Sequence, residues 1–239
     1  MASTRRIGIA GSTGRLGSLA MRLVQESDDL DAVAIDARDG TDLSELGLSG
    51  LDSIFDATVL DASERLVGAA VDAGVPMVVG TSGWSDERIQ ALRARGAERI
   101  RIVPNFSLGS VLETHLATIA ARHFTAVEVV EAHHDRKRDA PSGTATRTAE
   151  AIGAVRGFAP ATPDEPGRGT IIAGVPVHAL RLPGVVARQE VVFGGTGETL
   201  TIRHDTTSSD SYAAGILLAL RADPQPGVTV GIGDLLGLA

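Results

Sequence analysis

Apolar residues in the first hundred positions alternate between short runs and stripes at helical spacing. The short runs predict strands at residues 5–11, 30–36, 53–58, 75–80 and 100–106. The stripes between them predict helices at residues 15–27, 63–74 and 86–96. Strands that alternate with helices in this way are typical of βαβ units. The pattern therefore predicts a doubly wound parallel sheet.

The pattern changes at about Phe106. The helices predicted after this point lie near Val111–His123, at 144–155 and at 211–222, and the strands lie at 126–134, 170–182, 185–195 and 198–205. The last three strands look antiparallel, and residues 157–169 are a loop rich in Pro and Gly. The second half is therefore expected to be α+β in character.

A glycine-rich turn joins the first predicted strand to the first predicted helix. Gly11, Gly14 and Gly17 have the spacing G-x-x-G-x-x-G, a variant of the dinucleotide fingerprint G-x-G-x-x-G. Glycines in such a turn let pyrophosphate approach the backbone at the helix N-terminus. The spacing alone is a weak signal, and its position between strand and helix strengthens it. A plain tight turn is the alternative.

Asp36 ends the second predicted strand, where a carboxylate can accept hydrogen bonds from the ribose hydroxyls of NAD. It would repel the 2'-phosphate of NADP, which Arg15 and Arg38 could offset. We expect NADH or NADPH as cofactor, with NAD favoured slightly. An ordinary strand-end aspartate is as good an interpretation of Asp36 alone. The loops at 80–84 and 103–106 follow predicted parallel strands, so they are candidates for the nicotinamide side.

Lys137 is the only lysine among the 22 Lys and Arg residues of the chain. Histidines at 133 and 134 lie just before it. Histidine transfers protons near neutral pH and lysine can be tuned to do so, whereas arginine stays charged. Residues 142–144 open the next predicted helix, whose N–H groups suit an anion such as a carboxylate. A proton-transfer site for an anionic substrate is predicted, and a solvated charged loop is the alternative.

Composition argues against several other classes of protein. A net charge of -8 disfavours nucleic-acid binding, which needs a basic face. No apolar run is long enough to predict a membrane span, and the N-terminus lacks the features of a signal peptide. The chain has no cysteine, which excludes disulfides and fits a cytoplasmic protein. The paired histidines have no third ligand at zincin-like spacing, so no metal is expected.

Residues 131–145, EAHHDRKRDAPSGTA, resemble the signature E-x-H-H-x-x-K-x-D-A-P-S-G-T-A of the dihydrodipicolinate reductase family. The similarity continues, in the family's order, through GIAGSTGRLG, GTSGW, PNFSLG, GVPVHALRL and GETLTIRHD. A match of fifteen residues with such unusual content is highly specific. The resemblance covers most of the chain.

The resemblance implies an NAD(P)H-dependent reductase of lysine and diaminopimelate biosynthesis. Its substrate is a cyclic imine dicarboxylate, which accepts a hydride at C4 and then a proton at the adjacent carbon. His133 and Lys137 would transfer protons, His134 would contact substrate, and Gly143 and Thr144 would hold a carboxylate. The residues that the resemblance places at the cofactor are Gly11, Ser12, Thr13, Gly14, Arg15, Leu16, Asp36, Gly80, Thr81, Ser82, Val103, Pro104, Asn105 and Phe106.

The resemblance also implies a homotetramer whose subunits have two domains. Residues 1–105, completed by 209–239, would form a Rossmann-like dinucleotide-binding domain, and 106–208 an α+β substrate-binding and tetramerisation domain. Two departures from the family pattern concern the cofactor. Residues 56–60 read DATVL where the family has D-F-T-x-P, and Ser209 lies where an arginine is common. Either change could weaken cofactor binding or shift its preference.

Two alternative functions stay open. One is a related NAD(P)-dependent reductase of another cyclic imine or dicarboxylate. The other is a catalytically silent protein that senses the nucleotide and has kept the fold. The intact His133 and Lys137 argue against a sensor, whereas the departures at residues 57–60 and Ser209 argue mildly for it.

Overall fold

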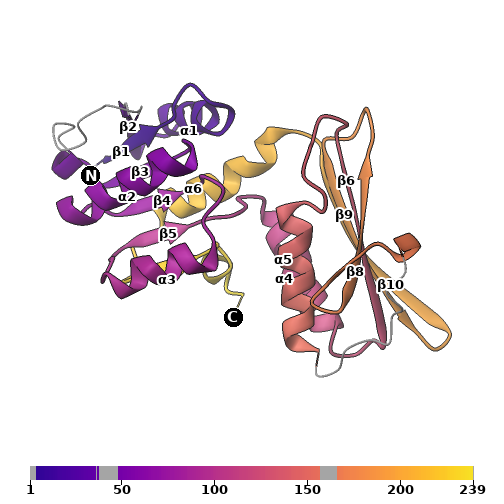
Figure 1. Cartoon of the computed structure of the whole chain (residues 1–239). Helices are drawn as coiled ribbons and strands as arrows, with labels where there is room; N and C mark the ends of the chain where they lie inside the picture. The colour runs from indigo at the N-terminus through magenta and orange to yellow at the C-terminus, as the bar shows by residue number, and fades with distance from the viewer. Residues whose placement is uncertain (1–3, 36, 38–47, 157–165, 239) are drawn as a thin grey trace. The chain divides into compact units, whose positions relative to one another are not determined.

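The computed structural model describes residues 4–35, 37, 48–156 and 166–238 of the 239-residue chain. The chain divides into two compact units, coloured along the sequence in Figure 1. Unit 1 comprises Met1–Ser107 together with Tyr212–Ala239, and unit 2 comprises Leu108–Ser211. Unit 2 is therefore inserted between two segments of unit 1.

Unit 1 is built on a six-stranded parallel sheet with the order β11-β5-β4-β3-β1-β2. Its strands are β1 (Arg5–Ala10), β2 (Leu30–Ile35), β3 (Ser53–Asp56), β4 (Met77–Val79), β5 (Ile100–Ile102) and β11 (Val228–Val230). Its helices are α1 (Arg15–Gln25), α2 (Leu60–Ala73), α3 (Asp86–Ala94) and α6 (Ala213–Arg221). Short 3₁₀ turns lie at Leu48–Gly50 and Asp234–Leu236. This arrangement confirms the predicted Rossmann-like parallel sheet.

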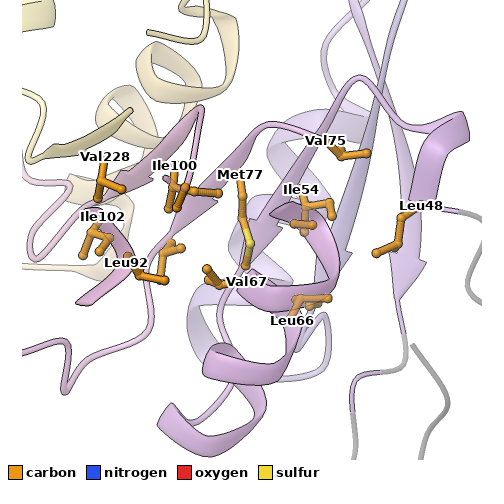
Figure 2. Packing of buried hydrophobic residues seen from close by; sticks show 14 of the residues in the cluster. Leu48, Ile54, Leu66, Val67, Val75, Met77, Leu92, Ile100, Ile102 and Val228 are labelled. Atoms are coloured by element: carbon orange, nitrogen blue, oxygen red, sulfur yellow. The ribbon is translucent and has the colours of Figure 1, made fainter. Parts of the chain in front are cut away.

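One row of side chains crosses four strands of this sheet. Ile54, Met77, Ile100 and Val228 are register partners on β3, β4, β5 and β11, and all four are buried. Figure 2 shows this row with Leu66 and Val67 of α2 and Leu92 of α3. A parallel sheet covered by helices needs strands that are apolar throughout, because both of their faces are buried. This is why the short apolar runs in the first half of the sequence predict its strands.

Unit 2 contains a five-stranded mixed sheet with the order β10-β9-β6-β8-β7. Its strands are β6 (Ala126–His133), β7 (Thr170–Ile172), β8 (Val175–Arg181), β9 (Ala187–Gly195) and β10 (Glu198–Thr206). Its helices are α4 (Leu108–Ala120) and α5 (Gly143–Val155), with 3₁₀ turns at Pro166–Arg168 and, leading into α6, at Ser209–Tyr212. Strand β6 pairs in parallel with β8 and antiparallel with β9.

Two predicted elements of unit 2 differ from the structure. The predicted strand at 170–182 is a hairpin of β7 and β8, because Ala173 and Gly174 adopt positive φ values of 48° and 80° and turn the chain. The helix predicted near Val111–His123 begins earlier, at Leu108, and ends at Ala120. Among the later strands, β7 pairs antiparallel with β8 and β9 pairs antiparallel with β10, whereas β8 and β9 are separated by β6.

The two faces of the unit 2 sheet have different roles. Odd-numbered residues of β6 and β9, such as Val129 and Val191, are buried in the core with α4 and α5. Side chains alternate along a strand, so Glu131 lies on this helix-covered face while Glu128 lies on the other. Strand β6 therefore brings one carboxylate into the interior of unit 2, close to the end of the strand.

Candidate active site

Glu131 is fully buried near the end of β6, and its carboxylate is bound by an arginine from the neighbouring strand. Nη1 of Arg181 donates to Oε2 of Glu131 at 2.9 Å, and Nη2 donates to Oε1 at 2.9 Å. The register explains this contact, because β8 pairs in parallel with β6 and places Arg181 opposite His133. The result is a bidentate (two-pronged) ion pair, the geometry in which arginine binds a carboxylate most strongly.

The same carboxylate holds His133 and the start of the following helix. Nδ1 of His133 lies 2.6 Å from Oε2 of Glu131, and the backbone N–H of Ser142 donates to Oε1 at 3.0 Å. Burial raises the pKa of Glu131, but hydrogen bonds from His133 and Arg181 outweigh burial and lower the pKa to about 2. Glu131 is therefore ionised at any working pH.

Lys137 lies in the loop between His134 and the next helix. Its Nζ forms an ion pair with Asp139, 2.9 Å from Oδ1 and 2.8 Å from Oδ2. Its backbone N–H donates to the carbonyl of His134 at 3.1 Å. Arg181 also donates to the carbonyl of Asp139, so the loop is attached to the Glu131 ion pair. The hydrogen bond from Lys137 lowers the pKa of the Asp139 carboxyl.

Helix α5 begins beside this loop, and its first turn is capped. Ser142 is the N-cap residue, and its Oγ accepts a hydrogen bond from the N–H of Ala145 at 3.2 Å. Gly143 and Thr144 follow as the first helical residues. The N–H groups of a first turn and the helix dipole favour a negatively charged ligand. A carboxylate is the ligand that this helix end suits, with the ammonium of Lys137 on the preceding loop.

The structure places all five candidate residues of unit 2 on one short segment, from the end of β6 to the start of α5. It adds three participants that were not predicted, Glu131, Arg181 and Asp139. Glu131 has a local signal, since a residue two positions before His133 on a strand shares its face. Arg181 has none, because only the pairing of β6 with β8 brings it to the site. Nδ1 of His134 is buried and has no hydrogen-bond partner among the described residues.

In unit 1 the glycine turn lies between β1 and α1, and two of its three glycines, Gly11 and Gly17, are required for steric reasons. Gly11 has φ 74°, and a Cβ there would lie 2.4 Å from the carbonyl oxygen of Ala57. A Cβ on Gly17 would lie 2.0 Å from the oxygen of Gly11. Gly14 is the N-cap of α1, and its N–H donates to the oxygen of Gly11 at 2.9 Å. The turn leaves room beside the N-terminus of α1, where Thr13, Gly14 and Arg15 are exposed.

The other cofactor candidates follow β4 and β5 at the same edge of the sheet. A Cβ on Gly80 would lie 2.9 Å from both Leu16 and Phe106, so these three predicted residues meet. The rest of this group comprises exposed positions Ser82 and Pro104, partly buried Asn105, and buried Thr81 and Val103. Asp36 and Arg38 lie outside the described residues.

These residues fit a dinucleotide. The glycines leave the helix N-terminus open to a pyrophosphate, as the fingerprint requires. Oγ1 of Thr81 is buried and finds no hydrogen-bond partner in the described part of the chain, so it is available to a ligand. The described residues offer no comparable site for a metal ion. Within the described ranges, no group of three or more His, Cys, Asp or Glu side chains is placed to hold a metal ion.

The loop that departs from the family pattern is held by hydrogen bonds. The buried carboxylate of Asp56 accepts from the backbone N–H of Thr58 at 3.0 Å, from its hydroxyl at 2.6 Å and from the hydroxyl of Ser63. Nε1 of Trp84 donates to that same Ser63 hydroxyl at 3.0 Å. The loops after β3 and β4 are therefore joined through Ser63, although the Phe and Pro of the family pattern are missing.

No helix in the described ranges has the length and apolar character that crossing a bilayer requires.

Comparison with known proteins covers both units. Residues 5–106 match the family model of the dihydrodipicolinate reductase N-terminus, and residues 109–236 match that of its C-terminus. A 4-hydroxy-tetrahydrodipicolinate reductase from Clavibacter michiganensis subsp. michiganensis is 46% identical over 98% of this chain and 87% of its own length. The enzyme of that name from Mycobacterium sp. (strain KMS) is 44% identical over 98% of this chain and 99% of its own.

Solved structures agree. A dipicolinate-bound dihydrodipicolinate reductase from Paenisporosarcina sp. TG-14 matches with a TM-score of 0.79 and 30% identity, over 97% of this chain and 99% of the other. An aspartate semialdehyde dehydrogenase II from Vibrio cholerae shares the fold alone, at a TM-score of 0.55 and 13% identity over 92% and 97% of the two chains. The resemblance noted in the sequence is thus confirmed, and the chain belongs to the dihydrodipicolinate reductase family.

Proposed function

We propose that this chain is a 4-hydroxy-tetrahydrodipicolinate reductase, which uses NADH or NADPH to form tetrahydrodipicolinate in lysine and diaminopimelate biosynthesis. Its family membership across both units supports this activity. The observation that carries the proposal is the segment from β6 to α5. It joins His133 and the capped N-terminus of α5 to the buried, ionised carboxylate of Glu131, and it carries Lys137 on the loop between them, paired with Asp139. Such a set can bind a dicarboxylate and move a proton.

The reaction has two parts. Loss of water from the hydroxylated ring leaves an unsaturated imine, which the cofactor, when bound, supplies with a hydride at C4. The electron pair released through the ring leaves an enamine, which takes up a proton at the adjacent carbon. The chain's own residues bind the two carboxylates, fix the ring and deliver that proton.

Unit 2 supplies the substrate site in this proposal. The backbone N–H groups of Gly143 and Thr144 bind one carboxylate at the start of α5. Lys137 adds a compact ammonium and, with His133, serves proton transfer, while His134 contacts the ring. A guanidinium in place of Lys137 would keep the charge but could not give up a proton. This explains why a chain whose other Lys and Arg positions are all arginine has a lysine at position 137.

Unit 1 supplies the cofactor site. The turn from Gly11 to Leu16 receives the pyrophosphate, and the loops at 80–82 and 103–106 lie on the nicotinamide side. Asp36 accepts the ribose hydroxyls, so NADH is favoured slightly over NADPH. Dinucleotide binding is supported by the glycine turn and by the buried hydroxyl of Thr81, which has no hydrogen-bond partner among the described residues.

The working protein is a homotetramer in the cytoplasm, formed through unit 2. The face of its sheet opposite α4 and α5 supports this assembly, because Leu180 on this face is 39% exposed, and its register partner on β6 is the apolar Ala132. The absence of cysteine suits a reducing compartment.

A coupled assay tests the activity directly. The product of dihydrodipicolinate synthase is supplied with NADH or NADPH, and the loss of nicotinamide absorbance is followed. Oxidation that depends on the substrate supports the proposal, and the ratio of the two rates reports the cofactor preference. A chain that binds NAD(P)H but oxidises neither with this substrate would instead be a nucleotide sensor or a reductase of another cyclic imine.

A further inference from the structure

We propose that Glu131 is the positioning residue of His133: its carboxylate holds a proton on Nδ1, so that Nε2 is the nitrogen that exchanges a proton with the substrate. The role in proton transfer to the substrate rests on the proposed function. The assignment of the proton to Nδ1 rests on the geometry of unit 2, where Nδ1 of His133 lies 2.6 Å from Oε2 of Glu131.

The charge of Glu131 decides which atom carries the proton. An ionised carboxylate accepts hydrogen bonds and donates none. The two-pronged ion pair with Arg181 keeps Glu131 ionised. Nδ1 of His133 must therefore be the donor, and in a neutral ring Nε2 is then unprotonated. A protonated ring can lose only its Nε2 proton without breaking the bond to Glu131, so proton transfer is directed to one side of the imidazole.

Glu131 also connects the proton donor to the carboxylate-binding helix end. Its Oε1 accepts the N–H of Ser142, the N-cap of α5, while its Oε2 binds His133. Full burial of the side chain leaves the carboxylate little freedom to move. The imidazole and the first turn of α5 thus share one fixed anchor, and precise placement of such groups governs catalytic efficiency.

Strand β6 carries a natural control on its other face. Glu128 also binds one histidine and one arginine, with Nε2 of His178 and Nη2 of Arg168 each 2.8 Å from a carboxylate oxygen. Its side chain is 38% exposed, and its partners lie outside the segment from β6 to α5. Glu128→Met and Glu131→Met therefore remove a carboxylate from the same kind of three-residue cluster, one away from the candidate site and one within it.

The test compares these two variants by nitrogen NMR of the histidine rings and by kinetics. In the wild type the neutral ring of His133 is expected as the Nδ1–H tautomer. Glu131→Met removes the acceptor and should change this tautomer and lower kcat at least about tenfold, as losing the partner that orients a functional histidine does. The KM for NAD(P)H should stay within about twofold, because the cofactor candidates lie in unit 1. Glu128→Met should change neither the tautomer of His133 nor kcat.

Two results would overturn the proposal: an Nε2–H tautomer in the wild type, or an unchanged tautomer and kcat in Glu131→Met. If the single variant does not fold, Glu131→Met/Arg181→Met removes both buried charges together. Retention of the Nδ1–H tautomer in this double variant would also overturn it. The NMR result does not depend on turnover, so a wild type that fails to reduce the substrate defeats the proposed function alone.

Discussion

Nε2 of Gln189 donates a hydrogen bond to Oε2 of Glu113 at 3.1 Å, deep in unit 2 where these side chains are only 5% and 3% exposed. The other oxygen of each group, Oε1 in both, has no hydrogen-bond partner among the described residues. Burial raises the pKa of Glu113 to about 8, so the carboxyl is mostly protonated at neutral pH. A protonated carboxyl supplies the donor that this cluster of oxygens lacks.

The pH dependence of stability should report this proton. Between the ordinary pKa of 4.5 and about 8, folded Glu113 binds a proton that the unfolded chain has lost, so stability falls as pH rises through this window. From pH 6 to 9 we expect the wild type to lose about 2 kcal/mol more than Glu113→Gln, which has no charge to bury.

Denaturant unfolding at several pH values measures this difference. Glu150→Gln, on the exposed side of α5, is the control and should keep the wild-type slope. An identical pH slope in Glu113→Gln and the wild type would show that Glu113 does not carry the proton.

Lys137→Ala should lower turnover by roughly 10²–10⁴-fold, the usual contribution of a proton-transfer residue. Its affinity for NAD(P)H should be nearly unchanged. Lys137→Arg keeps the charge and should be impaired as well, because guanidinium cannot yield a proton. Arg138→Ala removes the exposed neighbouring cation as a control. Steady-state kinetics within about threefold of the wild type for Lys137→Ala would show that the assigned role is wrong.

Substitutions at two glycines of the turn between β1 and α1 should distinguish an effect on cofactor binding from an effect on folding. A Cβ on Gly14 comes no closer than 3.3 Å to its nearest neighbour, whereas one on Gly17 would lie 2.0 Å from the backbone oxygen of Gly11. Gly14→Ala should therefore fold and lose affinity for NAD(P)H, measured by fluorescence titration. Gly17→Ala should be strongly destabilised.

Helix α2 offers the control for this pair. Gly68 has nothing within 4 Å of a Cβ, so Gly68→Ala should leave cofactor binding intact and add about 0.5–1 kcal/mol of stability. Unchanged cofactor affinity in Gly14→Ala would count against a pyrophosphate at this turn.

Ser142→Ala should remove the cap of α5 but leave the N–H that Glu131 binds. We expect a loss of about 1 kcal/mol in thermal or denaturant unfolding, together with a raised KM for the dicarboxylate substrate. Ser85→Ala removes the corresponding cap of α3, where Oγ accepts from Arg88 at 3.4 Å. It should leave the substrate KM unchanged. Equal effects of the two variants on KM would mean that the start of α5 does not hold the substrate.

Local sequence patterns predict most of unit 1 because its strands are apolar on both faces and each is followed by a helix. They miss β11, since a strand of three residues in an apolar tail is recognisable only by its pairing with β5. The sequence also does not predict the hairpin of β7 and β8, because its turn at Ala173 and Gly174 lies within a run of apolar residues and contains no polar turn residue.

The candidate site shows the same limit. His133 and Lys137 can be found from residue type and spacing, and Glu131 from strand alternation. Arg181 becomes visible only through the register of β6 with β8. The raised pKa of Glu113 likewise depends on burial that no local pattern reports, because the helix bearing it looks like an ordinary amphipathic segment.

The return of the chain to unit 1 has a consequence during synthesis on the ribosome. Strand β5 is made before unit 2, and its neighbour β11 after it. Until β11 is made, the β5 edge lacks this partner, and a bare strand edge invites pairing with other chains. Arg101 of β5 then binds both carboxylate oxygens of Asp234, just beyond β11, at 2.7 and 2.8 Å. Unit 1 therefore completes its sheet only after the whole of unit 2 has been translated.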